Sequence, residues 1–195
     1  MDNASGSANM PPHRCGDAGE RRALMERVFA LGVPRDYGRA RKLRVQREPM
    51  RLVSIGPDIH GRTQWLQPRA ARALARMRES AARANVALQI VSAFRSIEYQ
   101  IGIIERKRAR GLNMDEILRV SAAPGYSEHH SGRCVDFTAP GFPTLEEEFE
   151  RSAAFRWLQR NAMKYGFTLS YPRRNIHGIA YEPWHWCWHA RSFRC

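Results

Sequence analysis

The segment that decides the fold and the chemistry of this chain is Ser-Glu-His-His-Ser-Gly-Arg-Cys-Val-Asp, residues 127–136. A second informative segment, Glu-Pro-Trp-His, follows at residues 182–185. Histidine and carboxylate side chains in this order are typical of a hydrolytic zinc site. Three protein ligands leave the fourth position of a tetrahedral ion open for water, and a further carboxylate can accept a proton from that water. The two segments therefore predict a catalytic metal site.

Each segment alone also has a plainer explanation. The adjacent His129 and His130 could be surface residues of a polar loop. Trp184, Trp186 and Trp188 alternate as the residues of an aromatic core strand do. The His-Glu-x-x-His helix of many metalloproteases is absent from the sequence. The metal-site prediction therefore depends on both segments being present together.

Length and composition indicate one globular domain. The chain has 195 residues, of which 43% are hydrophobic and 26% charged, values typical of a soluble protein with a substantial core. No apolar stretch approaches the roughly 20 residues that span a bilayer. The first 20 residues lack the apolar run of a secretory signal. We therefore expect either that the protein is not exported by that route or that a leader is missing from this sequence.

The formal net charge of +13 comes almost entirely from arginine, since only three of the 32 basic residues are lysine (Lys42, Lys107 and Lys164). Such a field attracts anionic polymers, among them nucleic acid, cell-wall polymers and acidic lipid headgroups. The arginines are spread through the chain, and no zinc-finger spacing or recognition helix accompanies them. Nucleic acid is therefore the less favoured partner, although a basic nucleic-acid-binding protein stays open as an alternative.

The four cysteines are Cys15, Cys134, Cys187 and Cys195, and no two of them form a Cys-x-x-Cys pair. A redox motif or zinc ribbon is therefore not expected. The favoured interpretation of Cys134 and Cys187 is a small buried side chain at each position. A disulfide between them is the alternative and would require an oxidising compartment.

The hydrophobic pattern divides the chain into a disordered tail at residues 1–16, a helix and basic connector at residues 17–51, and the main domain at residues 52–195. Apolar spacing and capping residues predict helices at residues 17–32, 68–84, 97–110, 113–120 and 144–165, the last with Thr144 as N-cap. Strands are expected at residues 52–55, 87–94, 134–138, 167–171 and 179–188. Because helices and strands do not alternate regularly, we expect an α+β fold with a small, mainly antiparallel sheet flanked by helices.

Three motifs in order resemble those of the VanY-like zinc D-alanyl-D-alanine carboxypeptidases. They are Ser-Ala-Phe-Arg-Ser-x-x-x-Gln at residues 92–100, Pro-Gly-x-Ser-Glu-His-x-x-Gly-x-Cys-x-Asp at residues 124–136, and Glu-x-Trp-His at residues 182–185. The resemblance covers roughly residues 52 to 190. It implies the fold shared by D-Ala-D-Ala peptidases, lysostaphin-type enzymes and hedgehog domains.

Matched residue by residue, the resemblance implies that His129, Asp136 and His185 hold one zinc ion per chain. Glu182 would be the general base and then the acid that protonates the leaving amine. Arg95 would contact the peptide carbonyl or the C-terminal carboxylate, a role that suits its planar bidentate donor. Ser127 and Gln100 would line the substrate groove. Gly132 would permit a tight turn between the ligands.

The substrate that the resemblance implies is a peptidoglycan stem peptide, cut to release a terminal D-alanine. It also implies the cell envelope or periplasm as the location, although the absence of a signal peptide leaves the cytoplasm open. Phe94 stands where the family usually has Tyr, and Cys134 replaces a usual Ala. Cys134 could be a rival ligand or a redox-sensitive point, with packing as the favoured role. His130 is interpreted as a bystander or as a support for the ligands.

Four other functions remain open from the sequence. An L,D-carboxypeptidase or an endolysin-type endopeptidase would keep the chemistry and change the bond. A non-catalytic binding module with a zinc ion of purely structural role is possible because fold does not determine function. The presence of Glu182 argues against that module, because binding alone does not need a second carboxylate. A nucleic-acid-binding protein would show a steep salt dependence of DNA affinity.

Overall fold

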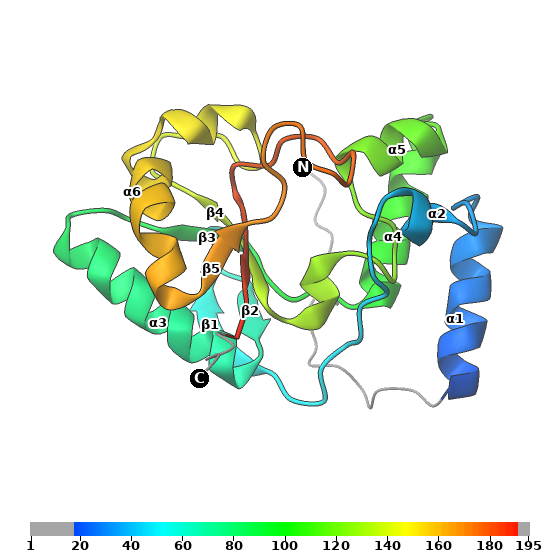
Figure 1. The fold of residues 1–195 in the computed structure, drawn as a ribbon, viewed down its shortest axis with the longest axis horizontal. Helices are drawn as coiled ribbons and strands as arrows, with labels where there is room; N and C mark the ends of the chain where they lie inside the picture. Colours follow the sequence, from blue (N-terminus) through cyan, green and yellow to red (C-terminus); the bar gives the residue numbers. More distant parts are fainter. Residues whose placement is uncertain (1–17, 191–195) are drawn as a thin grey trace.

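A four-stranded antiparallel sheet with the order β3-β4-β6-β5 forms the centre of the fold (Figure 1). The computed structural model describes residues 18–190, so the predicted tail at residues 1–16 lies outside the described residues. The sheet consists of β3 (Gln89–Ser92), β4 (Cys134–Thr138), β5 (Phe167–Leu169) and β6 (His185–Trp188). A separate hairpin pairs β1 (Val53–Pro57) with β2 (Thr63–Leu66). The predicted α+β class with small antiparallel sheets is confirmed.

Helices flank the sheet on both sides in Figure 1. The α-helices are α1 (Ala18–Ala30), α2 (Tyr37–Ala40), α3 (Pro68–Arg83), α4 (Ile97–Ala109), α5 (Met114–Val120) and α6 (Ala153–Asn161). Three 3-10 helices are η1 (Glu128–Ser131), η2 (Glu147–Arg151) and η3 (Ala162–Tyr165). The helices α3 and α6 lie on one side of the sheet, and α1, α2, α4 and α5 gather on the other. None of the helices within residues 18–190 combines the length and the apolar character that a bilayer span requires.

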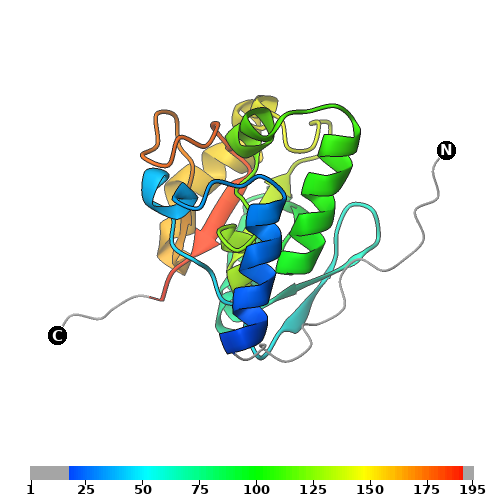
Figure 2. The same cartoon turned by 90° about the vertical axis from the view of Figure 1, so that its right-hand side faces the viewer.

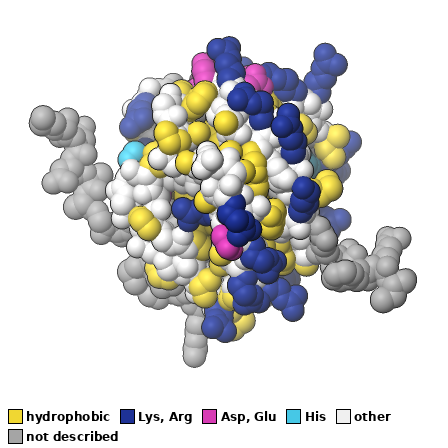
Figure 3. Space-filling view, turned by 90° about the vertical axis from the view of Figure 1, so that its left-hand side faces the viewer, with side chains coloured by type: hydrophobic (Ala, Val, Ile, Leu, Met, Phe, Trp, Pro, Cys, Tyr) yellow, Lys and Arg dark blue, Asp and Glu magenta, His cyan; other side chains and the backbone are white. Residues whose placement is uncertain are grey.

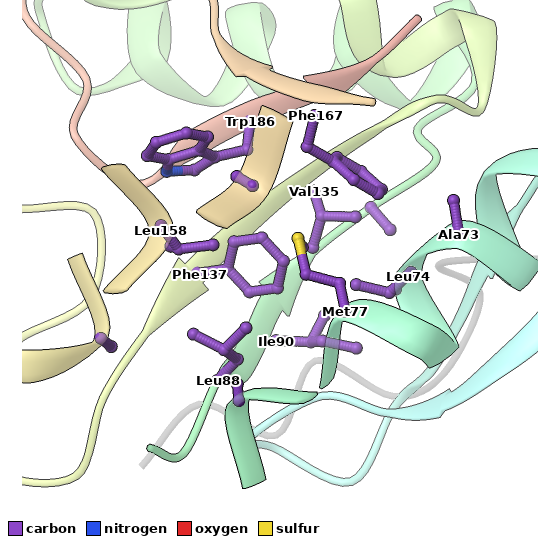
Figure 4. Close-up of a cluster of buried hydrophobic side chains, with 14 of the residues drawn as sticks. Ala73, Leu74, Met77, Leu88, Ile90, Val135, Phe137, Leu158, Phe167 and Trp186 are labelled. Carbon is purple, nitrogen blue, oxygen red and sulfur yellow. The ribbon is translucent and has the colours of Figure 1, made fainter. Parts of the chain in front are cut away.

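The larger hydrophobic core fills the space between the sheet, α3 and α6. From the sheet, Val135, Phe137 and Trp186 point toward Met77 of α3 and Leu158 of α6 (Figure 4). These sheet residues alternate with the polar residues of the same strands, as a pleated strand requires. Each buried side chain of this size contributes roughly 1.5–3 kcal/mol relative to an exposed one. The core therefore occupies one face of β4 and β6, and the polar side chains of these strands lie on the opposite face.

A smaller core holds α1 and α2 against α4 and α5. Its buried members include Val28, Tyr37, Ile101 and Leu118, and the ring of Tyr37 lies edge-on to Tyr126 at 5.2 Å between centroids. Figure 2 shows α1 and α4 side by side, where the Arg27 guanidinium donates to the Glu98 carboxylate at 2.8 and 2.9 Å. The basic connector is thus packed against the helices; the domain boundary at residue 52 stays a prediction.

The sequence did not predict β2 and α2, and the strand predicted at residues 167–171 ends at Leu169. Two predicted elements differ more widely from the structure. The helix expected at residues 144–165 is instead η2, α6 and η3, because Ser152 adopts an extended backbone and interrupts it. The Ser152 side chain accepts a hydrogen bond from the Phe155 amide, so Ser152 and not Thr144 is the N-cap of the α-helix. The strand expected at residues 179–188 is limited to β6, since residues 179–184 form no strand.

Candidate metal centre

The register of β4 against β6 places Asp136 directly opposite His185. Cys134 lies opposite Cys187 two residues along the same strands, and successive pairs at this spacing share one face of a sheet. Val135 and Trp186 point to the other face, into the larger core. The backbone ladder therefore brings a carboxylate and an imidazole together on the face turned away from α3 and α6.

The third member of the group, His129, comes from η1 just before β4. Gly132 ends this short helix with φ of +63°, in the left-handed region that favours glycine. A Cβ at that position would lie 2.9 Å from the Leu52 side chain and 3.3 Å from the backbone nitrogen of Gln67. The predicted tight turn between the ligands is present, and a bulkier residue would disturb both its backbone and its neighbours.

The three side chains converge within ligand distance of one another. His129 Nε2 lies 3.1 Å from Asp136 Oδ2, and His185 Nδ1 lies 3.0 Å from Asp136 Oδ1. All three donor atoms lie within 4.8 Å of one another. Ligands of a tetrahedral zinc ion at 2.0–2.2 Å are roughly 3.3 Å apart. The group therefore has the dimensions of a three-ligand site that keeps its fourth position open.

Hydrogen bonds select which histidine nitrogen is available to a metal. His129 Nδ1 is paired with the Ala93 carbonyl, whereas its Nε2 is buried and makes no hydrogen bond within the described part of the chain. Burial, together with the nearby positive charge of Arg95, lowers the pKa of His129 to about 4. The ring is therefore neutral at pH 7, and its Nε2 presents a lone pair to the group. This lone pair lies 3.1 Å from Asp136 Oδ2, so two acceptor atoms face one point and the donor set fits a cation.

Glu128 holds the other histidine of the group. Its Oε2 lies 3.0 Å from His185 Nε2, which leaves His185 Nδ1 facing Asp136. Burial raises the pKa of Glu128, but the hydrogen bond and charge of His185 lower it to about 2. A carboxylate that accepts a hydrogen bond from a metal-binding histidine raises the basicity of the imidazole and fixes the tautomer of the ring. The sequence reasoning missed this role, although Glu128 stood inside the quoted motif.

His185 binds a proton tightly when no metal is present. Burial lowers its pKa, but the hydrogen bonds to Asp136 and Glu128 outweigh burial and raise the pKa to about 10. The imidazolium is thus held between two carboxylates at neutral pH. Metal binding through Nδ1 requires the loss of this proton, so we expect metal affinity to rise with pH.

Glu182 lies beside the group but outside the ligand set. Its Oε2 is 3.9 Å from His185 Nδ1. Burial, opposed by the charge of His185, raises the pKa of Glu182 to about 7. A carboxylate with this pKa exchanges protons readily near neutral pH, which suits a general base. The structure therefore places the predicted base at the edge of the metal group.

Arg95 follows β3 and reaches the same group, with Nη2 3.7 Å from Asp136 Oδ2. Its Nε is buried and has no hydrogen-bond partner among the described residues. Gln100, on α4, donates from Nε2 to the Ala122 carbonyl at 3.2 Å, and its Oε1 is buried without a partner in the same part of the chain. Ser127 is buried immediately before η1. Gln100 and Ser127 are almost completely buried, and the substrate-binding roles of the three residues stay predictions.

His130 uses both ring nitrogens to hold the loop. Its Nδ1 is 2.7 Å from the Arg95 carbonyl, and its Nε2 accepts a hydrogen bond from the Gly125 amide at 3.1 Å. Burial lowers its pKa to about 3, so the ring is neutral. With neither nitrogen free, His130 supports the backbone next to Arg95 and is unsuited to bind the metal.

Cys134 and Cys187 are joined by a disulfide between β4 and β6. The favoured expectation of two separate small side chains was therefore wrong, and the alternative that had stayed open is the one observed. Sequence spacing could not decide this point, because the pairing depends on the strand register that places the two residues opposite one another. Cys15 and Cys195 lie outside the described residues.

Tyr171 is a second side chain that the sequence reasoning missed. Its ring lies 4.9 Å from that of His185, and its buried hydroxyl has no hydrogen-bond partner in the described structure. Burial raises its pKa, and the negative charges of Glu128 and Glu182 raise it further. An aromatic residue in a strand ordinarily indicates core packing, so no sequence signal distinguished this phenol.

Comparison with known proteins places these residues in a family context. The sequence model of VanY, described as D-alanyl-D-alanine carboxypeptidase, matches residues 63–191. The protein YodJ of Bacillus subtilis is 35% identical over 174 residues, which cover 84% of this chain and 58% of YodJ. The chain thus spans little more than half the length of this relative.

Two solved structures share the fold. LdcB, described as an LD-carboxypeptidase, superposes with a TM-score of 0.64 at 32% identity, covering 72% of this chain and 69% of that chain. A variant of the vancomycin-resistance D,D-pentapeptidase VanY, in complex with Zn(II), gives a TM-score of 0.56 at 26% identity, covering 72% of this chain and 79% of that chain. The Zn(II) of that protein and the candidate donor group of this chain together support zinc as the metal.

Proposed function

Because the chain belongs to the VanY family of D-alanyl-D-alanine carboxypeptidases, we propose that it is a zinc metallopeptidase that hydrolyses peptidoglycan stem peptides. Release of a terminal D-alanine is the proposed reaction. The observation that carries the proposal is the convergence of His129, Asp136 and His185 around one point, with the buried Glu182 carboxylate 3.9 Å from His185. We propose one zinc ion per chain, because the other candidate group among the described residues, Glu128, Cys134 and His185, shares His185 and has its Cys134 sulfur in the disulfide.

Each residue of the group has a defined part in the proposed mechanism. Zinc, when bound to His129, Asp136 and His185, supplies Lewis-acid chemistry that polarises a carbonyl and activates water near neutral pH. Glu182 accepts the proton of the attacking water and later passes it to the departing amino group. Arg95 donates to the oxygen on which negative charge develops. Glu128 keeps the His185 ring oriented throughout and takes no proton.

A second candidate function keeps the metal chemistry and changes the bond that is cut. An L,D-carboxypeptidase is the second candidate, because the likeness to LdcB extends over most of the described chain. Both activities use the same metal group and a free C-terminal carboxylate, and they differ in the configuration of the residue before the cut bond.

The test is mass spectrometry of defined stem peptides incubated with the zinc-loaded protein. A pentapeptide ending in D-Ala-D-Ala should lose one alanine, and a chelator should abolish this loss. An untouched pentapeptide together with a shortened tetrapeptide would replace the D,D assignment by the L,D one. Cleavage only within cross-linked wall would indicate an endopeptidase, and no cleavage of any of these by a zinc-loaded protein would favour a binding module.

We also propose that the basic surface attracts anionic polymers of the cell wall. Figure 3 shows a band of lysine and arginine side chains on one face, with few acidic side chains among them. On α3, Arg69, Arg72 and Arg76 surround Trp188 in a surface hollow of about 240 Å³. Cosedimentation with purified wall should fall steeply as salt rises, because exposed charges are screened; binding that ignores salt would contradict this role.

The proposed site of action is the cell envelope, where the proposed substrate is found. The disulfide between Cys134 and Cys187 supports this location, because disulfides persist in oxidising compartments. Fractionation of cells that produce the protein, followed by thiol labelling of each fraction, would test the proposal. Recovery of the protein only in a reducing compartment, with both thiols labelled, would contradict it.

A further inference from the structure

The His185 ring meets a different set of donor atoms at each of its two nitrogens. Its Nδ1 lies 3.0 Å from Asp136 Oδ1, on the side of the proposed zinc site. Its Nε2 lies 3.0 Å from Glu128 Oε2, and that carboxylate oxygen is 3.9 Å from the sulfur of Cys134. The donor atoms of Glu128, Cys134 and His185 all lie within 4.8 Å of one another. A second group with the dimensions of a metal site therefore lies at the opposite nitrogen of the same ring.

The three donors of this second group suit a thiophilic divalent cation. Zinc lies about 2.3 Å from a thiolate and about 2.0–2.2 Å from imidazole or carboxylate, so the donor atoms around one tetrahedral ion are roughly 3.3–3.6 Å apart. The separations of 3.0 and 3.9 Å in this group lie close to those values. Cys134 and His185 are buried, whereas the Glu128 side chain is 23% exposed. An ion can therefore reach the group from the side of Glu128.

The disulfide withholds one of the three donors. The Cys134 sulfur is bonded to Cys187, which lies directly opposite on β6. A thiolate binds metal ions, whereas a disulfide sulfur carries no charge to offer them. A dithiol reductant supplies two electrons and two protons, so the bond breaks into two thiols while the reductant becomes a disulfide. Metal binding then releases the Cys134 thiol proton to solvent.

We propose that reduction of the disulfide opens a second metal site, formed by Cys134, Glu128 and His185 Nε2, for a thiophilic divalent cation. A neutral imidazole offers a single lone pair, so an ion on Nε2 leaves none for the zinc site at Nδ1. The same ion also replaces the contact between Glu128 and His185 that orients the ring. The two sites are thus alternatives, and the disulfide keeps the competing sulfur away from His185.

The experiment uses the variant Cys187→Ala, which frees the Cys134 thiol without a reductant. All proteins carry Cys15→Ala and Cys195→Ala, so that no other cysteine of the chain remains. Metal-free protein is titrated with Cd²⁺, a soft ion that favours thiolate ligands, and ultraviolet absorption measures the charge transfer from thiolate to metal. This absorption band should appear in Cys187→Ala. It should also appear in protein that keeps both Cys134 and Cys187 and has been reduced with a dithiol and freed of it without oxygen, and it should be absent from the oxidised form.

Cys134→Ala is the matched control, since it keeps the Cys187 thiol, which is not a member of the donor group. It should give no band, and replacement of both cysteines by alanine should leave the proposed zinc site able to fill. Adding Glu128→Ala to Cys187→Ala should weaken Cd²⁺ binding by more than the roughly 10–100-fold that an outer contact contributes.

Cadmium bound to Cys187→Ala without the band, or an equal band in Cys134→Ala, would overturn the proposal. If Cys187→Ala does not fold, which circular dichroism detects, the reduced protein with both cysteines decides in its place. The absorption reads the metal ligands and not the release of alanine. Failure of the proposed peptidase reaction would therefore leave this result unaffected.

Discussion

The two sides of the site hold their residues in place by different means. On the sheet side, Asp136 and His185 are paired across β4 and β6 by the backbone ladder, with a disulfide two residues away. On the helical side, Gln100 depends on a single contact with the segment before the metal loop. The residues proposed for the metal chemistry are thus held by strand pairing, whereas Gln100, predicted to line the substrate groove, is held by a side-chain hydrogen bond.

A similar contrast separates the two hydrophobic cores. The larger core joins every strand of the four-stranded sheet to α3 and α6. The smaller core unites α1 and α2 with α4 and α5 and ends at Tyr126, one residue before Ser127. Changes on the sheet side should therefore affect metal binding and catalysis, whereas changes on the helical side should affect affinity for substrate. The following predictions test this division.

The largest effect is expected for His185→Ala. This change removes one of the three proposed metal donors and leaves Asp136 and Glu128 without their shared partner, so zinc and all measurable activity should be lost. Zinc content by elemental analysis and alanine release provide the measurements. His60→Ala, at an exposed histidine, is the control and should keep both. Full zinc content in His185→Ala would remove His185 from the ligand set.

Glu182→Gln should separate catalysis from metal binding. The amide keeps the size of the side chain but cannot accept a proton, so kcat should fall by roughly 10²–10⁴-fold with zinc content unchanged. Alanine release and elemental analysis are measured on the same preparation. Retained turnover in this variant would show that another group is the base.

The pH dependence of the wild-type enzyme provides a second test of Glu182. Because the base must be ionised, kcat/KM should rise with pH through the Glu182 pKa, which burial raises to about 7. A bound cation favours the carboxylate, so the acid limb should lie at or below about pH 7. A rate that is independent of pH between 4 and 8 would contradict this role.

Glu128→Ala should weaken metal binding without abolishing it. Loss of the hydrogen bond to His185 Nε2 frees the ring to rotate, and zinc affinity should fall by roughly 10–100-fold. Competition with a chelator of known affinity is the measurement. Glu128→Gln retains an acceptor oxygen, so it should restore part of the affinity. Equal affinities of all three proteins would show that Glu128 does not position His185.

The disulfide should contribute to stability and little to the metal group. The double variant Cys134→Ala/Cys187→Ala should unfold with a free energy lower by about 2–4 kcal/mol, measured by denaturant titration. Zinc content should remain that of the wild type. A reduced, metal-free wild-type protein should have the stability of the variant; equal stability of the oxidised and reduced metal-free proteins would show that the link does not strengthen the sheet side.

The smallest effect is expected on the helical side, for Arg41→Ala. The Arg41 guanidinium donates to the carbonyls of His177 and Gly178, and the His177 ring nitrogen Nδ1 pairs with the Arg41 carbonyl at 2.9 Å. Loss of the two guanidinium contacts, with the backbone carbonyl of residue 41 retained, should lower stability by roughly 1 kcal/mol and raise KM more than it lowers kcat. Arg39→Ala, at an exposed neighbour, should change neither. A loss of zinc in Arg41→Ala would contradict the division between the two sides.

Much of the fold and site could be predicted from local sequence. The helices α3, α4 and α5 follow periodic apolar residues and recognisable ends, and Asn113 caps α5 with a reciprocal bond to Glu116. The motif residues His129, Asp136, Glu182 and His185 were all named in advance, and the structure brings them to one place. Short stretches of sequence were enough for these predictions because each motif contains its chemically informative side chains. The hydrogen bonds of a helix likewise join residues that are close in sequence.

Other features required the tertiary structure. The helix expected at residues 144–165 is interrupted because Ser152 caps a new helix whose buried face packs on the sheet. The pairing of Cys134 with Cys187 and the partner of Glu128 both depend on residues distant in sequence. The sequence by itself determined which side chains are proposed to carry the metal chemistry. The strand register and the packing of α4 decided what those side chains face, because such contacts form only when separated segments are brought together.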